Sequence, residues 1–354
     1  MKANKNNSLI QMIVVLMLSS IFLVSCSKED SNSGASNPPV ISSVYASVKE
    51  NGQPADLIPL TQGYANNYYI INGSGFTTLK KVYFNDTEAP FNSNFVTDKS
   101  IVVLIDKDTP YANASNKLKI VTANGIAEFD FVVAPPAPTL KSFNPINAAD
   151  GSVVTLYGSF FLNPVITVGN SQATIVSSNL NEVKIILPAG SNHKQIKVTT
   201  ISGSSTYYAA VGTAIFDDVF YTPWTIESWN NHVFITDANA EQGTTYYKKS
   251  MDAWGNIQGN WDWFDQIAPY KGIRLAIKAD KVGKIKLVFN GNWNDATAPI
   301  LDVTKEWKVF HLTWSDLLNA DHVQNISFQN FTKTPTGDGD ANVFYFDNFG
   351  YDIN

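Results

Sequence analysis

Hydrophobic and polar positions alternate in short runs along most of the chain beyond residue 40. The runs are rich in Val, Ile, Tyr, Phe and Thr, and they are interrupted by Gly, Asn, Asp and Pro. Alternation with a period of two is typical of β-strands that bury one face, and a helical period is hard to find here. Clear examples are residues 118–121, 183–187, 196–200 and 284–289. The pattern predicts an all-β protein built from sandwiches.

The N-terminal segment differs from the rest of the chain. Lys2 and Lys5 precede an apolar run over residues 9–24, which ends in Leu-Val-Ser-Cys at Cys26. This ending resembles the lipobox of bacterial lipoproteins, in which the cysteine is acylated and becomes the first residue after cleavage. A transmembrane helix and an ordinary secretory signal are the alternatives, but a span needs about 20 apolar residues and this run is shorter. We therefore expect residues 1–25 to be a lipoprotein signal peptide.

Cysteine usage agrees with a lipid anchor. Cys26 is the only cysteine, so the mature chain forms no internal disulfide. The following Ser-Lys-Glu-Asp (27–30) resembles the acidic signal that directs lipoproteins to the outer face of the outer membrane in one Gram-negative phylum. Acyl chains on Cys26 would anchor the protein to that membrane without spanning it. Residues 26–38 then form a tether, and the expected location is the cell surface.

An internal repeat follows the tether. The stretch Y-Y-I-I-N-G-S-G-F (68–76) aligns with V-V-T-L-Y-G-S-F-F (153–161), and N-K-L-K-I-V-T-A-N-G (116–125) aligns with residues 193–203. We expect Gly73 in the first stretch and its counterpart in the second to serve a bend at which a side chain would clash.

Both repeats resemble the IPT/TIG immunoglobulin-like domain. The second repeat keeps more of the signature, namely Pro138, Phe143, Pro145, Gly151, Val154, Leu156, Gly158 and Phe161. The first repeat lacks a counterpart of Pro145. The resemblance implies two Ig-like (IPT/TIG) sandwiches, which we place at residues 39–134 and 135–213. Some TIG domains bind DNA, and others are rigid spacers.

Charge decides between these two roles. The chain has 25 basic and 31 acidic residues, a net charge of −6, and no basic block. Because phosphate binding depends on clustered Lys and Arg, nucleic acid is excluded as a partner. The Pro-rich joint at 134–138 also suits a spacer, since Pro-rich linkers are semi-rigid and extended.

Residues 214–354 have a different composition. All eight tryptophans lie between Trp224 and Trp314, and the two repeats have none. Both ends of this segment read as strands, and pairing of the first and last strands closes many jelly-roll sandwiches. The run W-x-x-F-x-L-x-W-x-D-L from Trp307 resembles the late strands of β-jelly-roll carbohydrate-binding modules. Trp307 and Trp314 lie in apolar alternation, and we expect both in the core.

The order of these parts resembles that of surface glycan-binding lipoproteins encoded beside outer-membrane glycan importers. The resemblance implies that the C-terminal domain holds a polysaccharide, that the Ig-like domains act as a stalk, and that an importer complex is a partner. It also suggests a neutral glycan such as a β-glucan or a hemicellulose like xyloglucan.

Tryptophan in polar surroundings carries the site prediction. The stretch W-G-N-I-Q-G-N-W-D-W-F-D-Q (254–266) sets three indoles among amides and acids. A pyranose presents an apolar face that a flat indole can cover, and its hydroxyls need amides or carboxylates around the rim. Trp229 is as readily a core residue as a ligand contact, and Trp263 is the least secure because Phe264 can take its place in the core. The predicted ligand-binding residues are Trp254, Trp261, Trp263, Trp293, Trp229, Gln258, Asn260, Asp262, Asn292 and Asn294.

Enzyme chemistry has weaker support in the sequence. A glycosidase needs two facing carboxylates roughly 5–10 Å apart, and acidic residues are available, but no motif singles out a pair; the candidates are Glu227, Glu241, Asp262, Asp265 and Asp295. The four histidines have no zinc spacing, and no Gly-x-Ser-x-Gly occurs. We therefore expect a non-catalytic binding protein, with a cryptic glycoside hydrolase or lyase and a surface adhesin as alternatives.

Metal binding is expected at most in a structural role. No cofactor is implied, but Asp218 and Asp347 lie near the first and last strands of the C-terminal segment and could hold a structural Ca²⁺. Gly-Asp-Gly-Asp at 337–340 lacks the fuller ligand pattern of a calcium loop and predicts a tight turn.

Overall fold

The computed structural model describes residues 37–48, 53, 55–221, 223–259 and 265–353. Strands and short 3₁₀ turns make up the regular structure of these residues, so the predicted all-β fold class is confirmed. The chain divides into two compact units, Met1–Pro136 and Ala137–Asn354. The predicted signal peptide, Cys26 and most of the tether lie outside the described residues. No helix in the described ranges is both long and apolar enough to span a bilayer.

The first unit is an Ig-like sandwich. Its sheets have the orders β1-β3-β7-β6 and β5-β4-β8-β9, and β10 pairs in parallel with β2. A cluster that includes Val44, Ile71, Phe84 and Phe131 is buried within this unit. The strand bounds are β1 Val40–Ala46, β2 Gln62–Tyr64, β3 Tyr68–Ser74, β4 Leu79–Phe84, β5 Thr87–Ala89, β6 Phe91–Val96, β7 Ser100–Leu104, β8 Lys117–Thr122, β9 Gly125–Asp130 and β10 Val132–Ala134.

The second Ig-like sandwich opens the second unit and repeats this topology. Its sheets have the orders β11-β12-β16-β15 and β14-β13-β17-β18, which match those of the first sandwich strand for strand. The strand bounds are β11 Thr139–Asn144, β12 Val153–Ser159, β13 Val165–Val168, β14 Ser171–Gln172, β15 Thr174–Ser178, β16 Glu182–Ile186, β17 Gln195–Thr200 and β18 Gly203–Ala210.

One glycine in each repeat shows why the aligned motifs are alike. A Cβ on Gly73 would lie 1.9 Å from the carbonyl oxygen of Val40, and a Cβ on Gly158 would lie 1.9 Å from that of Thr139. In both repeats the glycine therefore lets the first strand approach its neighbour at a bulged register. The predicted clash at these two positions is confirmed.

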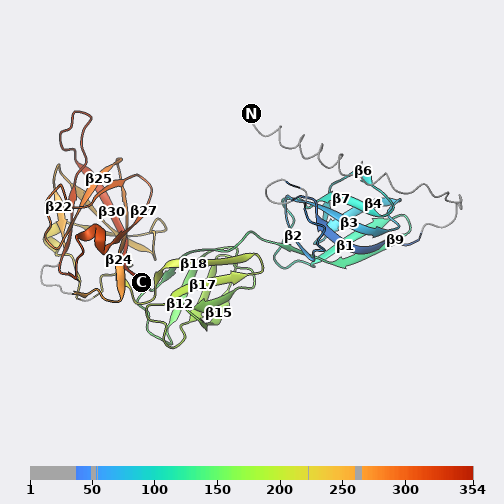
Figure 1. Cartoon of the computed structure of the whole chain (residues 1–354), viewed down its shortest axis with the longest axis horizontal. Coiled ribbons are helices and arrows are strands. Elements are labelled where there is room, and N and C mark those ends of the chain that lie inside the picture. The colour runs from blue at the N-terminus through green and yellow to red at the C-terminus, as the bar shows by residue number, and fades with distance from the viewer. Residues whose placement is uncertain (1–36, 49–52, 54, 222, 260–264, 354) are drawn as a thin grey trace. The chain divides into compact units, whose positions relative to one another are not determined.

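The C-terminal sandwich follows, with two antiparallel sheets. One has the order β20-β21-β30-β24-β27, and β19 also pairs with β30, as predicted for the first and last strands; the other has the order β22-β29-β25-β26. In Figure 1, β24, β30 and β27 lie side by side. The strand bounds are β19 Ala214–Phe216, β20 Val233–Thr236, β21 Thr245–Met251, β22 Asn256–Gln258, β23 Asp265–Gln266, β24 Tyr270–Ala279, β25 Gly283–Phe289, β26 Ile300–Val303, β27 Lys308–Thr313, β28 His322–Val323, β29 Ile326–Asn330 and β30 Asn342–Ile353.

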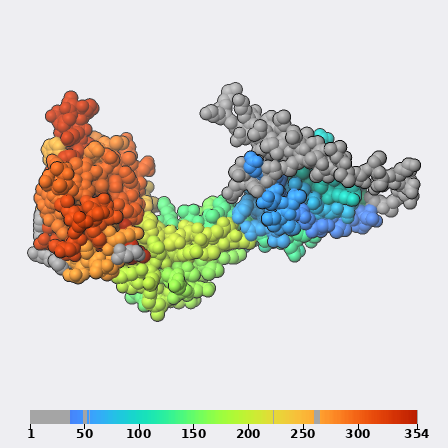
Figure 2. Space-filling model, in the orientation of Figure 1, coloured from blue at the N-terminus to red at the C-terminus, as the bar shows by residue number. Residues whose placement is uncertain are grey.

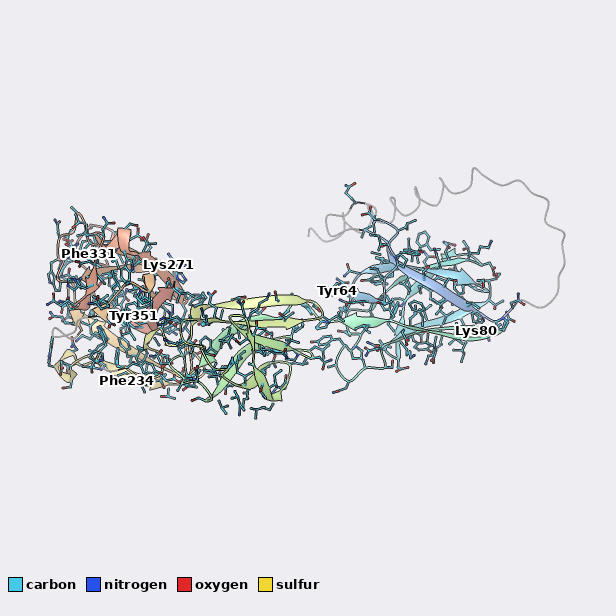
Figure 3. The ribbon with its side chains drawn as sticks, turned by 60° about the horizontal axis from the view of Figure 1, so that its bottom comes forward. Tyr64, Lys80, Phe234, Lys271, Phe331 and Tyr351 are labelled. Carbon is cyan, nitrogen blue, oxygen red and sulfur yellow. The ribbon has the colours of Figure 1, made fainter. Side chains whose placement is uncertain are left out.

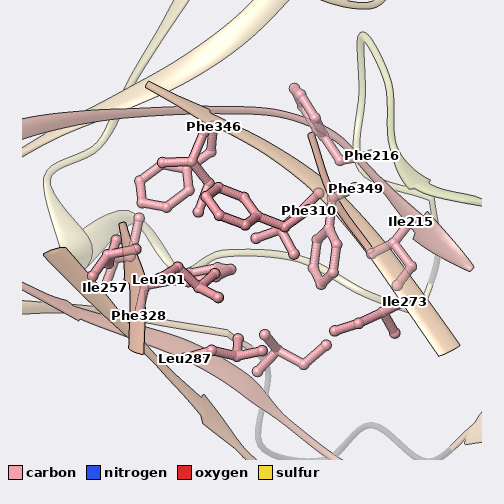
Figure 4. Close-up of a cluster of buried hydrophobic side chains, with 14 of the residues drawn as sticks. Ile215, Phe216, Ile257, Ile273, Leu287, Leu301, Phe310, Phe328, Phe346 and Phe349 are labelled. Atoms are coloured by element: carbon pink, nitrogen blue, oxygen red, sulfur yellow. The ribbon is translucent and has the colours of Figure 1, made fainter. Parts of the chain in front are cut away.

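Two 3₁₀ turns complete this sandwich, and its core lies between the two sheets. The turns are η2 Ser228–Asn230 and η3 Trp314–Leu317. Ile257, Leu287, Phe328 and Phe346 converge in the core from strands of both sheets (Figure 4). In the space-filling view the sandwich forms the orange-to-red surface (Figure 2). Because the core uses one side chain of every two along each strand, the alternate side chains form two outward faces.

The second Ig-like sandwich and the C-terminal sandwich share a buried polar network. The Asp217 carboxylate accepts the Ile146 N–H at 2.8 Å, and the hydroxyl of Tyr207 donates to Gln242 Oε1 at 3.0 Å. Nδ2 of Asn348 donates to Tyr207 Oη at 2.9 Å. Buried polar groups that are hydrogen-bonded in this way fix one relative placement, because separating them would leave donors and acceptors unpaired.

Candidate functional site

Two of the tryptophans predicted to contact ligand, Trp254 and Trp293, lie in loops next to strands of the sheet β22-β29-β25-β26. Its register sets Asn256, Gln329, Lys286 and Ile300 in one row across the four strands. These side chains alternate with the core residues of the same strands, so they belong to the outward face. The local sequence is therefore polar because one side of each strand is turned away from the core.

Two exposed indoles lie on this face, and the Phe331 ring and the Lys286 ammonium group pack between them. Trp254 is 41% exposed, and its ring centroid lies 5.1 Å from that of Phe331 in an edge-to-face arrangement. Lys286 Nζ lies 5.4 Å from the Phe331 ring and 5.6 Å from the ring of Trp293, which is 37% exposed. We call this surface, with Trp254, Phe331, Lys286 and Trp293 at its centre, the Trp254 face.

A hairpin beside the sheet supports Trp254. An isolated bridge pairs Lys333 with Gly339, and a Cβ on Gly339 would lie 2.7 Å from Trp254 Nε1. Only glycine leaves room for the indole here. Nζ of Lys333 is 5.9 Å from the Trp254 ring and 5.5 Å from the Phe331 ring, within cation–π range. The tight turn of this hairpin lies at residues 334–337, where the Gly337 N–H donates to the Thr334 carbonyl oxygen at 2.9 Å, so the turn predicted at 337–340 is placed too far along the chain.

Lys286 is neutralised within the Trp254 face. Its side chain is only 4% exposed, and Nζ donates to Asp295 Oδ1 at 2.7 Å and to the Trp293 carbonyl oxygen at 3.1 Å. The lysine thereby ties the loop of Trp293 to the sheet. Since an opposite charge satisfies this ammonium group, the centre of the face offers a ligand aromatic surface and amides, while Lys333 beside Trp254 is exposed.

Gln258 and Trp229, two of the remaining predicted ligand residues, lie on or next to the Trp254 face. Gln258 shares the Trp254 face, because its Nε2 donates to Asn256 Oδ1 at 2.9 Å. Trp229 is 58% exposed in η2, next to Asn230, whose Oδ1 accepts the Gln258 N–H at 2.9 Å.

Asn292 and Asn294 shape the loop around Trp293. Oδ1 of Asn292 accepts the Asn294 N–H at 3.2 Å, and Oδ1 of Asn294 accepts the Ala296 N–H at 3.0 Å. The other four predicted ligand residues lie outside the described residues; they are Asn260, Trp261, Asp262 and Trp263.

Sequence reasoning missed three residues of the Trp254 face and misplaced one tryptophan. Phe331, Lys286 and Lys333 were not predicted; the alternation Ser327, Gln329, Phe331 along β29 was the available signal. The expected core position of Trp307 is wrong. Trp307 is only partly buried on the opposite sheet, where Nε1 donates to the Asn239 carbonyl at 2.6 Å. It lies three positions before the core residue Phe310, so the alternation of β27 turns it outward. Trp314, in contrast, packs against the core.

Four of the carboxylates considered for catalysis or calcium have protein partners: Asp265, Asp295, Asp218 and Asp347. Asp265 accepts the Tyr351 hydroxyl at 2.6 Å, and Asp295 pairs with Lys286. Asp218 Oδ1 accepts the Thr245 N–H at 2.6 Å. Oδ2 of Asp347 accepts two further backbone N–H groups, and burial nevertheless raises its pKa well above the usual range.

The structural calcium at Asp218 and Asp347 stays a prediction. Within the described ranges, no three Asp, Glu, His or Cys side chains gather in a way that could hold a metal ion.

Comparisons with known proteins bear on the fold. The profile of the IPT/TIG domain matches residues 138–212, so the chain contains an IPT/TIG domain there. An IPT/TIG domain-containing protein of Bacteroides ovatus is 25% identical over 197 residues, a match that covers 53% of this chain and 38% of that protein. The chain thus spans well under two thirds of that relative.

Solved structures extend the likeness across most of the chain. The surface glycan-binding protein PbSGBP-B from Prevotella bryantii is similar with a TM-score of 0.51 at 15% identity, covering 90% of this chain and 99% of that one. SGBP-B from a complex xyloglucan utilization locus in Bacteroides uniformis aligns with a TM-score of 0.39 at 15% identity, over 89% and 99% of the two chains. At this identity the likeness to PbSGBP-B concerns the fold.

Proposed function

We propose that the protein binds a neutral polysaccharide, without cleaving it, on the Trp254 face of the C-terminal sandwich. The observation that carries the proposal is the pair of half-exposed indoles, Trp254 and Trp293, held on one sheet face by Phe331 and Lys286. The solved structure with the same fold is described as a surface glycan-binding protein, which supports the same class of function.

The chemistry of the face suits a sugar chain. Each indole can cover the apolar C–H face of a pyranose, and burial of that surface supplies most of the affinity. Amides of Asn256, Gln258 and Gln329 lie on the same face and can pair with hydroxyl groups. Because Asp295 neutralises Lys286, the buried ammonium group at the centre of the face needs no anionic ligand, and the exposed Lys333 beside Trp254 can stay hydrated.

We propose binding of the glycan without cleavage because the carboxylates of the Trp254 face are bound to lysines. Asp295 is the carboxylate held at the centre of the Trp254 face, and its Oδ1 is bound to Lys286. A glycosidase needs a second carboxylate facing the first across the scissile bond. Asp302, which alternates with the core residues of β26 on this face, is likewise bound to a lysine, since Lys284 Nζ donates to its Oδ1 at 2.6 Å.

The cellular role completes the proposal. We infer that Cys26 carries a lipid that anchors the protein to the outer membrane, with the Ig-like sandwiches as a spacer, and that the glycan passes to an outer-membrane importer. The lipobox and the Ser-Lys-Glu-Asp after it support this role. Incorporation of a labelled fatty acid, lost in Cys26→Ala, is the expected result, and labelling that persists in the variant contradicts the anchor.

Affinity gels test the binding function. We expect a panel of soluble neutral glycans, including β-glucans and xyloglucan, to contain one that retards the wild-type protein without release of reducing ends. Trp254→Ala combined with Trp293→Ala should weaken that binding on the order of 1,000-fold, since two such aromatic contacts of about 2 kcal/mol each sum to about 4 kcal/mol. Trp307→Ala is the matched control and should bind normally. Retention of wild-type binding by the double variant contradicts the proposal.

A further inference from the structure

The opposite face of the C-terminal sandwich holds a second cluster of rings around a lysine. Lys278 lies on β24 directly across from Tyr345 on β30. Its Nζ is 4.6 Å from the ring of Trp307, 5.2 Å from that of Tyr345 and 5.3 Å from that of Tyr246. We call this surface, with Lys278, Tyr246, Trp307 and Tyr345 at its centre, the Lys278 face.

The rings of the Lys278 face are fixed in place. The Tyr345 hydroxyl donates to Asp280 Oδ1 at 2.9 Å, and the Tyr246 hydroxyl donates to Asp237 Oδ2 at 3.2 Å. Burial and the Asp280 carboxylate raise the pKa of Tyr345 to about 12, so its hydroxyl remains a donor at neutral pH. The ring of Trp307 meets that of Tyr246 edge to face at 5.6 Å. A binding surface of this kind is preorganised, because its side chains need no reordering.

A hollow of about 240 Å³ opens beside these rings. Its lining residues are Tyr246, Lys278, Ala279, Asp280, Lys305 and Tyr345. The volume lies below the roughly 300–1,000 Å³ of pockets for drug-sized ligands. It therefore suits one sugar residue rather than a longer stretch of chain.

The lining of this hollow has more ammonium groups than carboxylates. Among the residues that the structure describes, neither Lys278 nor Lys305 forms an ion pair with a carboxylate, in contrast to Lys286 on the Trp254 face. Asp280 lines the hollow too and already accepts the Tyr345 hydroxyl, so the lining holds two ammonium groups and one carboxylate. Asp237 lies outside the lining, accepts the Tyr246 hydroxyl, and has its pKa lowered chiefly by a backbone hydrogen bond and in part by Lys278. The aromatic faces orient the Lys278 ammonium but cannot accept all three of its N–H bonds.

We propose that this hollow is a second binding site, which takes one carboxylate-bearing sugar residue of a polysaccharide. The sugar carboxylate would accept charge-assisted hydrogen bonds from Lys278 and Lys305, and its ring would contact the Tyr246 and Tyr345 rings. The proposal rests on the proposed function for its ligand class, but it concerns a different surface and a different charge.

The test compares one glycan with and without its carboxylates. The probe is a xylan with glucuronic acid branches, and its control is the same xylan after chemical reduction of the carboxyl groups to alcohols. Calorimetry with the full-length protein should give a preference for the acidic form on the order of fivefold at low salt, which declines as salt screens the charges. Lys278→Gln and Lys305→Gln should each reduce the preference, and together should abolish it.

Controls separate this site from the Trp254 face. Lys271→Gln removes an exposed charge from the same strand without touching the hollow and should keep the preference (Figure 3). Trp254→Ala with Trp293→Ala should weaken both xylans but leave their ratio unchanged. Equal binding of the two xylans by the wild type, or a preference that survives in Lys278→Gln with Lys305→Gln, overturns the second site. Failure to bind any neutral glycan would instead count against the proposed function alone.

Discussion

The two outward faces of the C-terminal sandwich each pack aromatic rings around a lysine, but only one of the two lysines has an ion-pair partner among the described residues. Each surrounds a lysine with aromatic rings, Lys286 with Trp293 and Phe331, and Lys278 with Trp307 and two tyrosines. On the Trp254 face the lysine is buried and bound to Asp295, and two indoles stay half-exposed. On the Lys278 face no carboxylate pairs with the lysine among the described residues. Similar residue types therefore suit different ligands, depending on whether the cation has a partner.

The largest expected effect comes from removal of the ring that joins the Trp254 face. Phe331→Ala should lower the free energy of unfolding by about 3 kcal/mol, because a nearly buried ring is lost. It should also weaken neutral glycan binding at least tenfold, because Trp254 and Lys286 lose their shared neighbour. Tyr246→Ala removes a comparably buried ring from the Lys278 face. Chemical denaturation should show a similar destabilisation for it, whereas binding of the neutral glycan should stay within twofold. Equal loss of neutral glycan binding in both variants would contradict the claim that this glycan binds only the Trp254 face.

A smaller effect is expected from displacement of one indole. In Gly339→Val the new Cβ would lie 2.7 Å from Nε1 of Trp254. This distance is too short, so the indole must move. Neutral glycan affinity, measured by calorimetry, should fall on the order of fivefold. Gly337→Ala, at the tip of the same hairpin, has open space around its Cβ but a φ of +96°. It should cost roughly 1 kcal/mol of stability without changing affinity. An unchanged affinity in Gly339→Val would show that the position of Trp254 is immaterial.

The smallest expected effect is a difference in stability between variants of the two carboxylates near Lys286 and Lys278. Asp295→Asn leaves Lys286, whose side chain is 4% exposed, without its anionic partner. Because the Asp295 side chain is 64% exposed and screened by solvent, the loss of stability should be about 1 kcal/mol. Asp280→Asn keeps an oxygen that can accept the Tyr345 hydroxyl, so its effect should stay within about 0.5 kcal/mol. Thermal unfolding of the two variants checks the difference, and an equal shift would contradict the separate roles of the two carboxylates.

Much of the fold could be predicted from sequence because alternation reports directly on strands. The predicted run at 284–289 is β25, and the motif around Gly158 forms the bulged pairing inferred from its repeat. The buried network around Asp217 and Gln242 could not be predicted, since it depends on contacts between residues about 70 to 100 positions apart.

The candidate site was only partly accessible to sequence reasoning. Trp254 and Trp293 stood out because a bulky ring in a polar stretch has few reasons to be buried, and the structure exposes both. Phe331 and Lys286 did not stand out, because each lies at an ordinary position of an alternating strand and gains its role from neighbours on other strands. Trp307 shows the converse error. It lies an odd number of positions from the core residues Phe310 and Leu312, so the same alternation turns it outward.

The central claim is that a neutral glycan lies across the Trp254 face. A crystal structure of the protein with an oligosaccharide of the glycan that retards it in gels tests this most directly. We expect pyranose rings in van der Waals contact with the indoles of Trp254 and Trp293, with hydroxyl groups hydrogen-bonded to amides such as that of Gln329. An oligosaccharide bound elsewhere, with both indoles free of contact, would contradict the claim.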